Sequence, residues 1–113
     1  MRVHVVAVGK LKKHYVAEGV KDYLNRIRHY ISLSMVETKE EDPFNIIDKE
    51  GFHIILDAQG QSMTSEEFAS FVDNLLTTRS EDVFFYIGGP EGFSEKFKNK
   101  AQMQVSLSPM TFP

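Results

Sequence analysis

The stretch Val83–Phe93, VFFYIGGPEGF, joins five apolar residues to a turn that contains three glycines. A short apolar run without alternating polar residues is typical of a strand that is covered on both faces, as in parallel sheets. The glycines that follow allow the backbone of the turn to come very close to another group. That group is either a ligand or another part of the protein, and a tight turn used only for packing is the general alternative.

On both sides of this stretch, apolar strands alternate with helical patterns. Thr64 and Glu67 have the spacing of a capping box, and apolar residues recur at helical spacing after them. This alternation predicts an α/β fold, with a mostly parallel sheet flanked by helices, in a single domain over residues 1–113. The predicted strands are 3–8, 31–37, 52–57, 83–87 and 104–108, and the predicted helices are about 15–30, a short one within 46–50, one that follows Thr64, and one from Ser94 to about Ala101.

In a parallel sheet, ligands bind beyond the carboxyl ends of the strands. Three turn-rich segments follow predicted strands in this way, namely 57–62, 88–93 and 108–112. The GGPEG turn is neither a Walker A loop nor a G-x-G-x-x-G motif, and Glu91 would repel a phosphate group. We therefore expect a neutral cleft lined by backbone groups, which suits an adenine ring better than a polyphosphate.

The chain offers few side chains for catalysis or metal binding. It has no cysteine, its four histidines are scattered, and no carboxylate cluster has the spacing of a metal site. His4 and His53 fall within predicted strands and are expected to be structural, while Asp57, at a strand end, is expected to cap a turn. No apolar run is long enough to span a membrane, so we expect a cytoplasmic protein that binds neither a membrane nor a metal.

Charge is distributed unevenly along the chain. The net charge is −3, but residues 1–30 carry seven basic and two acidic side chains, while the remaining residues are strongly acidic. A general nucleic-acid binder is expected to be basic overall, and this chain is not. A local basic cluster is nevertheless possible, and a solvated helix surface is the alternative reading of the same residues. The cluster consists of Lys10, Lys12, Lys13, Lys21, Arg26 and Arg28.

Four segments of the chain, taken in order, resemble the RlmH (YbeA-like) family of SPOUT-class methyltransferases. They are VHVVAVGKLKKHYVAEGVKDYLNRI near the amino terminus, HIILDAQGQSMTSEEFA in the middle, FYIGGPEGFS, and the closing VSLSPMTFP. Each segment alone is weakly specific, but four in the same order over almost the whole chain are a strong match.

The resemblance implies a specific activity and site. Members transfer the methyl group of S-adenosylmethionine to N3 of a pseudouridine in large-subunit ribosomal RNA, as homodimers with a trefoil knot at the carboxyl edge of the sheet. It does not identify a catalytic base in this chain. By position, the contacts with the cofactor would fall here on Leu56, Gly88, Leu107, Ser108, Pro109, Met110, Thr111 and Phe112.

The sequence departs from the family in two places. Members continue beyond the residues that match TFP with a helix and a tail that complete the knot and pair the subunits, whereas this sequence stops at Pro113. They also carry a longer helix before the strand that matches FHIILD. We therefore expect an incomplete knot in these residues, and marginal stability and no activity without such a tail. The alternative function is a non-catalytic α/β ligand-binding module derived from the same fold.

The basic cluster generates a prediction about RNA. Reversing both charges with Lys12→Glu and Lys13→Glu should weaken binding of ribosomal RNA by roughly tenfold or more, because lysines that neutralise phosphates release counterions on binding. The loss should shrink as salt is raised. Titration of labelled ribosomal RNA at two salt concentrations measures both effects, and an unchanged affinity would identify the cluster as solvated surface.

Overall fold

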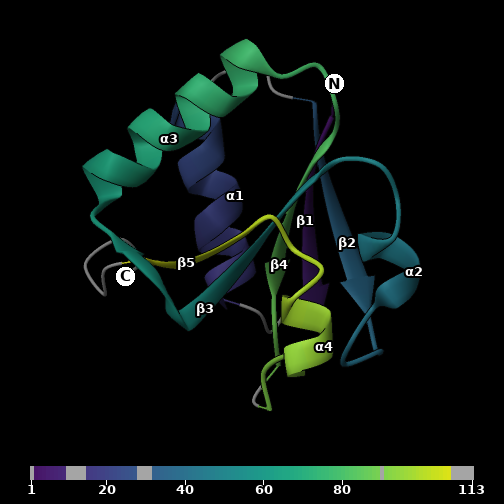
Figure 1. Cartoon of the computed structure of the whole chain (residues 1–113). Helices are drawn as coiled ribbons and strands as arrows, with labels where there is room; N and C mark the ends of the chain where they lie inside the picture. The colour runs from purple at the N-terminus through teal and green to yellow at the C-terminus, as the bar shows by residue number, and fades with distance from the viewer. Residues whose placement is uncertain (1, 10–14, 28–31, 90, 108–113) are drawn as a thin grey trace.

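The computed structural model describes residues 2–9, 15–27, 32–89 and 91–107. Within these residues the chain forms a five-stranded sheet in which every pair of neighbouring strands is parallel, so the predicted α/β fold class is confirmed (Figure 1). The elements are β1 (Val3–Val8), α1 (Tyr15–Ile27), β2 (Leu33–Thr38), α2 (Phe44–Ile47), β3 (Phe52–Met63), α3 (Ser65–Thr78), β4 (Val83–Ile87), α4 (Glu95–Lys98) and β5 (Met103–Leu107).

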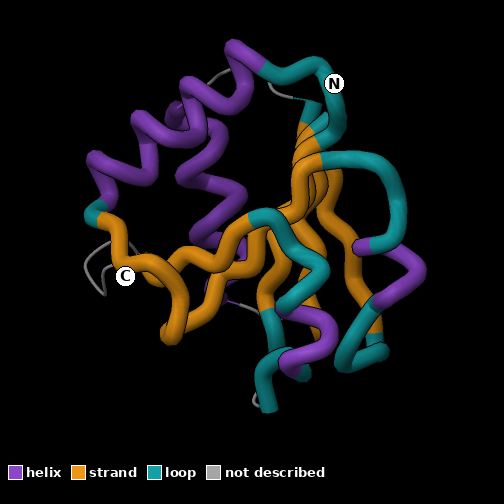
Figure 2. The backbone as a smooth tube through the Cα atoms, viewed as in Figure 1, coloured by secondary structure: helices purple, strands orange, loops and turns teal. Residues whose placement is uncertain are grey.

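The helices cover both faces of the sheet, whose strand order is β2-β1-β4-β3-β5 (Figure 2). The connections from β1 to β2 and from β3 to β4 step toward the β2 edge, and they carry α1 and α3 on one face. The connections from β2 to β3 and from β4 to β5 step the other way, and they carry α2 and α4 on the opposite face. Crossover connections between parallel strands are right-handed. Connections that step in opposite directions along the sheet must therefore cross on opposite faces, so the strand order itself dictates this three-layer arrangement.

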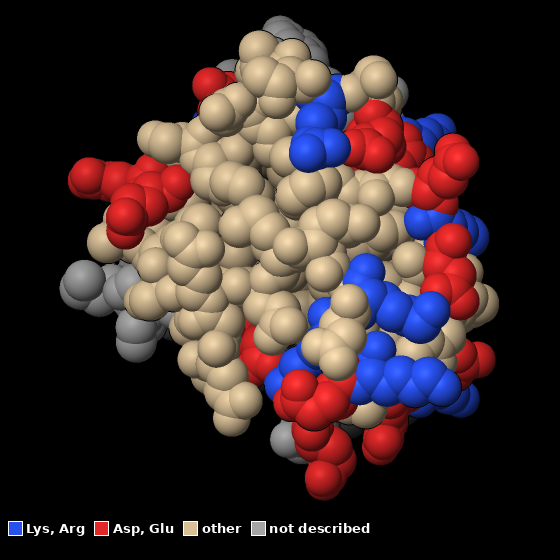
Figure 3. Space-filling model, viewed as in Figure 1, with Lys and Arg blue, Asp and Glu red and all other residues tan. Residues whose placement is uncertain are grey.

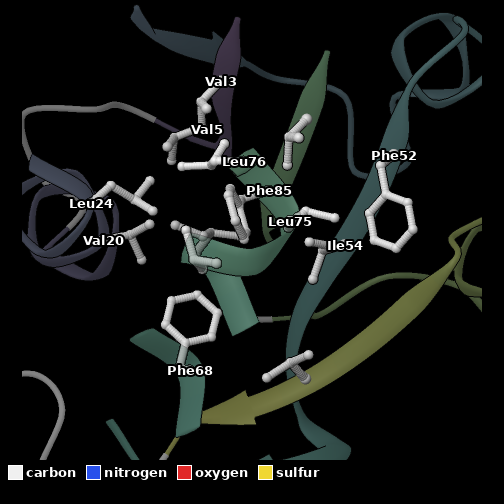
Figure 4. Close-up of a cluster of buried hydrophobic side chains, with 14 of the residues drawn as sticks. Val3, Val5, Val20, Leu24, Phe52, Ile54, Phe68, Leu75, Leu76 and Phe85 are labelled. Carbon is white, nitrogen blue, oxygen red and sulfur yellow. The ribbon is translucent and has the colours of Figure 1, made fainter. Parts of the chain in front are cut away.

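Alternate residues of the central strands enter the two helical layers. Val5, Ile54 and Phe85 belong to the cluster beneath α1 and α3, where they meet Val20 and Phe68 of those helices (Figure 4). Their neighbours in sequence point to the other face and pack under α2 and α4; they are Val6, Ile55 and Tyr86. Because all five residues of β4 are buried, its sequence is apolar throughout, as expected for a strand covered on both faces.

Both predicted helix caps are present. The hydroxyl of Thr64 accepts from the backbone N–H of Glu67 at 3.1 Å, and the carboxylate of Glu67 accepts from the backbone N–H of Thr64 at 2.9 Å, which completes the capping box of α3. Ser94 caps α4 by accepting from the N–H of Phe97 at 3.2 Å. Caps of this kind satisfy backbone donors that have no partner inside the helix.

Several boundaries differ from the predicted ones. α2 begins at Phe44, before the predicted segment, and α4 ends at Lys98 rather than near Ala101. β2 begins at Leu33, and residues 28–31 lie outside the described part of the chain. Among the described helices, none has the length and apolar character needed to cross a membrane.

The prediction that residues 57–62 form a loop after a strand that ends at Asp57 is wrong. β3 extends to Met63, but its pairing with β5 changes register between Leu56 and Gln61, since both of these residues pair with Val105. Residues 57–60 therefore bulge out of the ladder, and residues 61–63 rejoin it. The polar sequence correctly indicated irregular backbone, but it gave no sign that pairing would resume.

A stack of aromatic rings occupies the amino-terminal half of the α2/α4 face. The ring of Phe84 lies between those of His4 and His53, with centroids 4.5 and 4.6 Å away. Nε2 of the buried His53 lies 2.8 Å from the carbonyl oxygen of Lys49, which can only accept, so this nitrogen carries the proton. Nδ1 then accepts from the hydroxyl of Tyr86 at 2.7 Å. His53 is thus fully partnered as a neutral ring.

The buried position of His53 predicts a loss of stability in mild acid. Burial lowers the pKa of His53 below its usual value of 6.5, so the unfolded chain binds a proton first as the pH falls. The stabilising effect is complete above pH 6.5 and is lost as the pH falls from there through the pKa of the folded state. Between about pH 7.5 and 5.5 the free energy of unfolding should fall by up to about 1 kcal/mol more than in His53→Gln.

Urea unfolding of the two proteins at several pH values measures this difference. His53→Gln is the matched control because it keeps a polar side chain but cannot bind the proton, and contributions from the other histidines cancel in the comparison. Parallel pH profiles for the two proteins would show that His53 does not resist protonation in the folded state.

Candidate functional site

The inner strands line up in one row across the sheet at the point where the first part of the β3–β5 ladder ends. Leu56 of β3 pairs with both Ile87 of β4 and Val105 of β5, and Ile87 also pairs with Ala7 of β1. Gly88, which directly follows Ile87, is therefore adjacent to Leu56. The structure brings together two of the predicted cofactor residues from strands that are separated by nineteen residues of sequence, 64–82.

The remaining predicted cofactor residues come from the end of β5. Leu107 is the last residue of this strand and pairs with Met63 in the second part of the β3–β5 ladder. Leu107 lies two positions after Val105 in β5, so it extends beyond the row that Val105 forms with Leu56 and Ile87. Ser108, Pro109, Met110, Thr111 and Phe112 lie outside the described residues. The expectation of an incomplete knot therefore stays a prediction.

The turn after β4 is folded tightly on itself. A Cβ atom built on Gly88 would lie 3.1 Å from the ring of Phe93 and 3.3 Å from the Cα of Gly92. Gly92 has a positive φ of 70° and its N–H donates to the carbonyl of Gly89 at 3.0 Å. The ring of Phe93 is buried and stacks on that of Phe97 in α4, with centroids 4.7 Å apart. Position 88 therefore requires glycine, in the first place, because the turn packs closely on itself.

The bulge in β3 depends on a second close approach. A Cβ atom on Gly60 would lie 2.5 to 2.7 Å from backbone atoms of Gln104 and Val105 in β5. Such distances do not occur in folded proteins, so only glycine fits where the bulge returns toward the ladder. Within the bulge, the carboxylate of Asp57 accepts from the N–H of Gln59 at 3.2 Å, which is the turn-capping role expected for Asp57.

Asp57 also has a partner that the sequence did not indicate. Its Oδ2 lies 2.7 Å from Nζ of Lys98, the last residue of α4. The bond to this ammonium is the main cause that lowers the pKa of Asp57, and the same bond raises the pKa of Lys98. No spacing rule connects residues 57 and 98, because only the crossover of α4 places them side by side.

The edge formed by Leu56 and Gly88 is apolar and rich in backbone. Ile87 is buried, while Leu56 and Val8 are partly exposed. The charges of Asp57 and Lys98 neutralise each other, and Glu91 is exposed. These groups can bind a flat apolar ring and read its edges through main-chain N–H and C=O groups, whereas the described residues at this edge offer a polyphosphate no free pair of cations. The described residues contain no cluster of side chains able to hold a metal ion.

The basic cluster is only partly described. Lys21 and Arg26 lie on α1, and Arg26 is exposed, while the other four members fall outside the described residues. Arg26 borders a shallow, open hollow of about 550 Å³ between α1 and α3, together with Tyr23, Ala69, Ser70 and Asp73. None of these residues belongs to the edge formed by Leu56 and Gly88. On the face shown in Figure 3, charged side chains of both signs gather over α2 and α4, and the middle of the face is uncharged.

Comparison with known proteins identifies the family. The chain matches over residues 1–113 the family described as predicted SPOUT methyltransferase. The chain belongs to this family. The resemblance carried by the four sequence segments is thereby confirmed, and so is the expectation that the parallel sheet is that of a SPOUT protein.

Curated relatives align with all or nearly all of the chain. The protein from Coprothermobacter proteolyticus named ribosomal RNA large subunit methyltransferase H is 74% identical over 113 residues, which are 100% of this chain and 81% of the relative. Proteins of the same name from Pelotomaculum thermopropionicum and Fusobacterium nucleatum are 37% and 31% identical over 131 and 129 residues, covering 98% and 100% of this chain and 82% and 83% of those relatives. The alignments with the last two relatives are longer than this chain, whereas the alignment with the first relative is as long as the chain.

The close approach at Gly60 generates a stability prediction. Gly60→Ala should lower the free energy of unfolding by about 1–3 kcal/mol, because β5 must move away from the added methyl group. Gly89→Ala is the matched control, since its Cβ would meet only the side chain of Val8 at 3.5 Å. The control should change stability by no more than about 0.5 kcal/mol. Urea unfolding compares the variants, and equal stability would show that β5 yields without cost.

Proposed function

We propose that this protein methylates large-subunit ribosomal RNA with S-adenosylmethionine as the methyl donor, and that the target atom is N3 of a pseudouridine. The observation that carries the proposal is the 74% identity, over the whole chain, to a protein named ribosomal RNA large subunit methyltransferase H. The family match over residues 1–113 supports methyl transfer as the type of reaction. The donor and the target atom rest on the resemblance to the RlmH family.

The groups at the carboxyl edge fit the donor. Leu56 and the turn at Gly88 offer an apolar side chain and close backbone on neighbouring strands, which suits an adenine ring. The residues that would complete the site are those at and beyond the end of β5, namely Leu107, Ser108, Pro109, Met110, Thr111 and Phe112. The turn at Gly88 and the residues beyond Leu107 follow strand ends, where parallel sheets bind their ligands, and Leu56 lies beside them at the start of the bulge in β3.

Positioning is the main contribution that the described residues can make to catalysis. S-adenosylmethionine, when bound, would supply a methyl group that a nucleophilic nitrogen attacks in line, with the bond from that methyl group to sulfur breaking to leave S-adenosylhomocysteine and the N3 proton passing to solvent. Holding two reactants in the reactive geometry can lower a barrier by about 7–11 kcal/mol in the best cases. The described residues at this edge can hold the donor through apolar contact and backbone groups and keep water from its ring.

The two described histidines are badly placed to act as the base. His4 and His53 are each the second residue of a strand, at the amino end of the sheet. His4 precedes Val8 by four residues, which is about 13 Å along a strand. A nucleotide bound at the carboxyl edge would be out of reach of both rings. We therefore assign neither of them a catalytic role.

The proposal includes a homodimer that acts in the cytoplasm on ribosomal RNA. The resemblance to the RlmH family supports the pairing of subunits and the RNA substrate. The basic residues of 1–30, among them Lys21 and Arg26 on α1, are the chain's best candidates for contacts with RNA phosphates. Because the net charge is −3, we expect such contacts to be local rather than spread over the molecule.

Transfer of labelled methyl groups tests the function. Incubated with ribosomes and labelled S-adenosylmethionine, the protein in a form that carries the family's carboxyl-terminal tail should label large-subunit RNA, and nucleoside analysis should find the label on N3 of a pseudouridine. Calorimetric titration with S-adenosylmethionine should show binding, and titration with ATP should show much less. Binding without transfer would instead support a non-catalytic ligand-binding module, and absence of both would overturn the proposal.

Gly88→Val links the activity to the edge of the sheet. The branched side chain would push against Phe93 and displace the turn, so binding of the methyl donor should be lost. Gly89→Ala alters the same turn without a close contact and should bind normally. Thermal unfolding of both variants separates a local change in the turn from loss of the fold.

A further inference from the structure

The ion pair between Lys98 and Asp57 is unusual for its burial. The side chains retain 11% and 20% of their exposure, and Nζ lies 2.7 Å from Oδ2. Each other ion pair among the described residues has at least one partner that is 40% exposed or more. Exposed pairs contribute little to stability, whereas a shielded pair fixes the positions of the groups it joins more firmly.

This ion pair joins two segments of the candidate site. Asp57 directly follows Leu56 and is the first residue of the bulge 57–60. Lys98 ends α4, the helix that follows the Gly88 turn. The bulge has left the β3–β5 ladder, so the ladder does not fix its position. The two bonds of the Asp57 carboxylate, one to Lys98 and one to the N–H of Gln59, replace part of the lost pairing.

Helix α4 is anchored independently of this ion pair. The carboxylate of Asp42 accepts from the N–H of Ser94 at 3.0 Å, at the start of the helix. Nζ of Lys100 lies 2.9 Å from the carboxylate of Asp48, beside α2. Phe97 is fully buried in the second core cluster. The helix is thus a fixed support, and Lys98 is the side chain by which it holds the bulge.

We propose that Lys98 and Asp57 form a positioning pair that holds the bulge 57–60 beside the Gly88 turn in the conformation that binds the methyl donor. The inference rests on the proposed function for the identity of the ligand. Both oxygens of Asp57 are engaged, Oδ2 by Lys98 and Oδ1 by Gln59, so this carboxylate acts by position rather than as a base. Removing either charge releases the bulge without removing any group that touches the donor.

Lys98→Met and Asp57→Asn test the ion pair. Methionine keeps the apolar stem of the lysine, and asparagine keeps an oxygen that can accept from Gln59. Each variant should bind S-adenosylhomocysteine, the demethylated product, about tenfold more weakly in calorimetric titration. The double variant should bind no more weakly than either single variant, because both substitutions break the same bond. Lys98→Arg, which keeps the charge, should restore most of the affinity.

Lys100→Met is the matched control. It removes a lysine of the same region and its bond to an aspartate, but that bond leads to α2 and not to the bulge. Its affinity for S-adenosylhomocysteine should stay within about twofold of the unchanged protein. Thermal unfolding of all variants shows whether a loss of affinity accompanies a general loss of stability, which a merely structural role would require.

Hydrogen exchange separates failure of this inference from failure of the proposed function. The amides of Ala58, Gln59 and Gly60 should exchange faster in Lys98→Met than in Lys100→Met, with or without ligand. If the unchanged protein does not bind S-adenosylhomocysteine, the proposed function fails, and exchange still decides whether the pair orders the bulge. If it binds and Lys98→Met binds equally well, or exchange at the bulge is unchanged, the positioning pair is refuted.

Discussion

The backbone hydrogen bonds that β4 shares with both neighbours set the geometry of the whole molecule. β4 pairs with β1 and β3 in parallel, and its first residue, Val83, lies opposite the first residue of each, Val3 and Phe52. Because all five side chains of β4 are buried, a slip by one residue would exchange the contents of the two cores. The fixed register therefore places the end of β4 beside Leu56, and the turn that begins at Gly88 can start only there.

Much of this arrangement could be predicted from the sequence because it depends on local signals. Continuous apolar runs indicated the inner strands, and the spacing of Thr64 and Glu67 indicated the start of α3. The glycine turn was correctly placed, but the group that its backbone approaches could not be predicted from the residues of the turn. Its nearest neighbour is Phe93 of the same turn, a contact that exists only once Phe93 packs on Phe97.

The parts that were missed depend on contacts between distant segments. The return of β3 to its ladder after the bulge requires β5, which lies some forty residues later in the chain. The partnership of Asp57 with Lys98 requires the crossover that brings α4 over the sheet. Neither leaves a pattern in the residues nearby, since a polar segment with a glycine has the same composition in a loop and in a bulge. The cofactor residues beyond β5 stay a prediction.

The two ends of the sheet differ in the groups that they present, side chains at one end and backbone at the other, and this difference bears on mechanism. Toward the amino end, the buried ring of His53 stacks on Phe84, and the hydroxyl of Tyr86, the fourth residue of β4, donates to His53, which fixes these side chains in one arrangement. At the carboxyl end, glycines at 60, 88, 89 and 92 expose or bring together backbone, and the shielded ion pair of Lys98 and Asp57 is internally neutralised. A site of this kind presents few side chains that could exchange protons. It can still present backbone at fixed positions, and for a donor that already carries its leaving group, a fixed position is the main requirement. The shielded charges of Lys98 and Asp57 fit that requirement, because they hold backbone in place without entering the reaction.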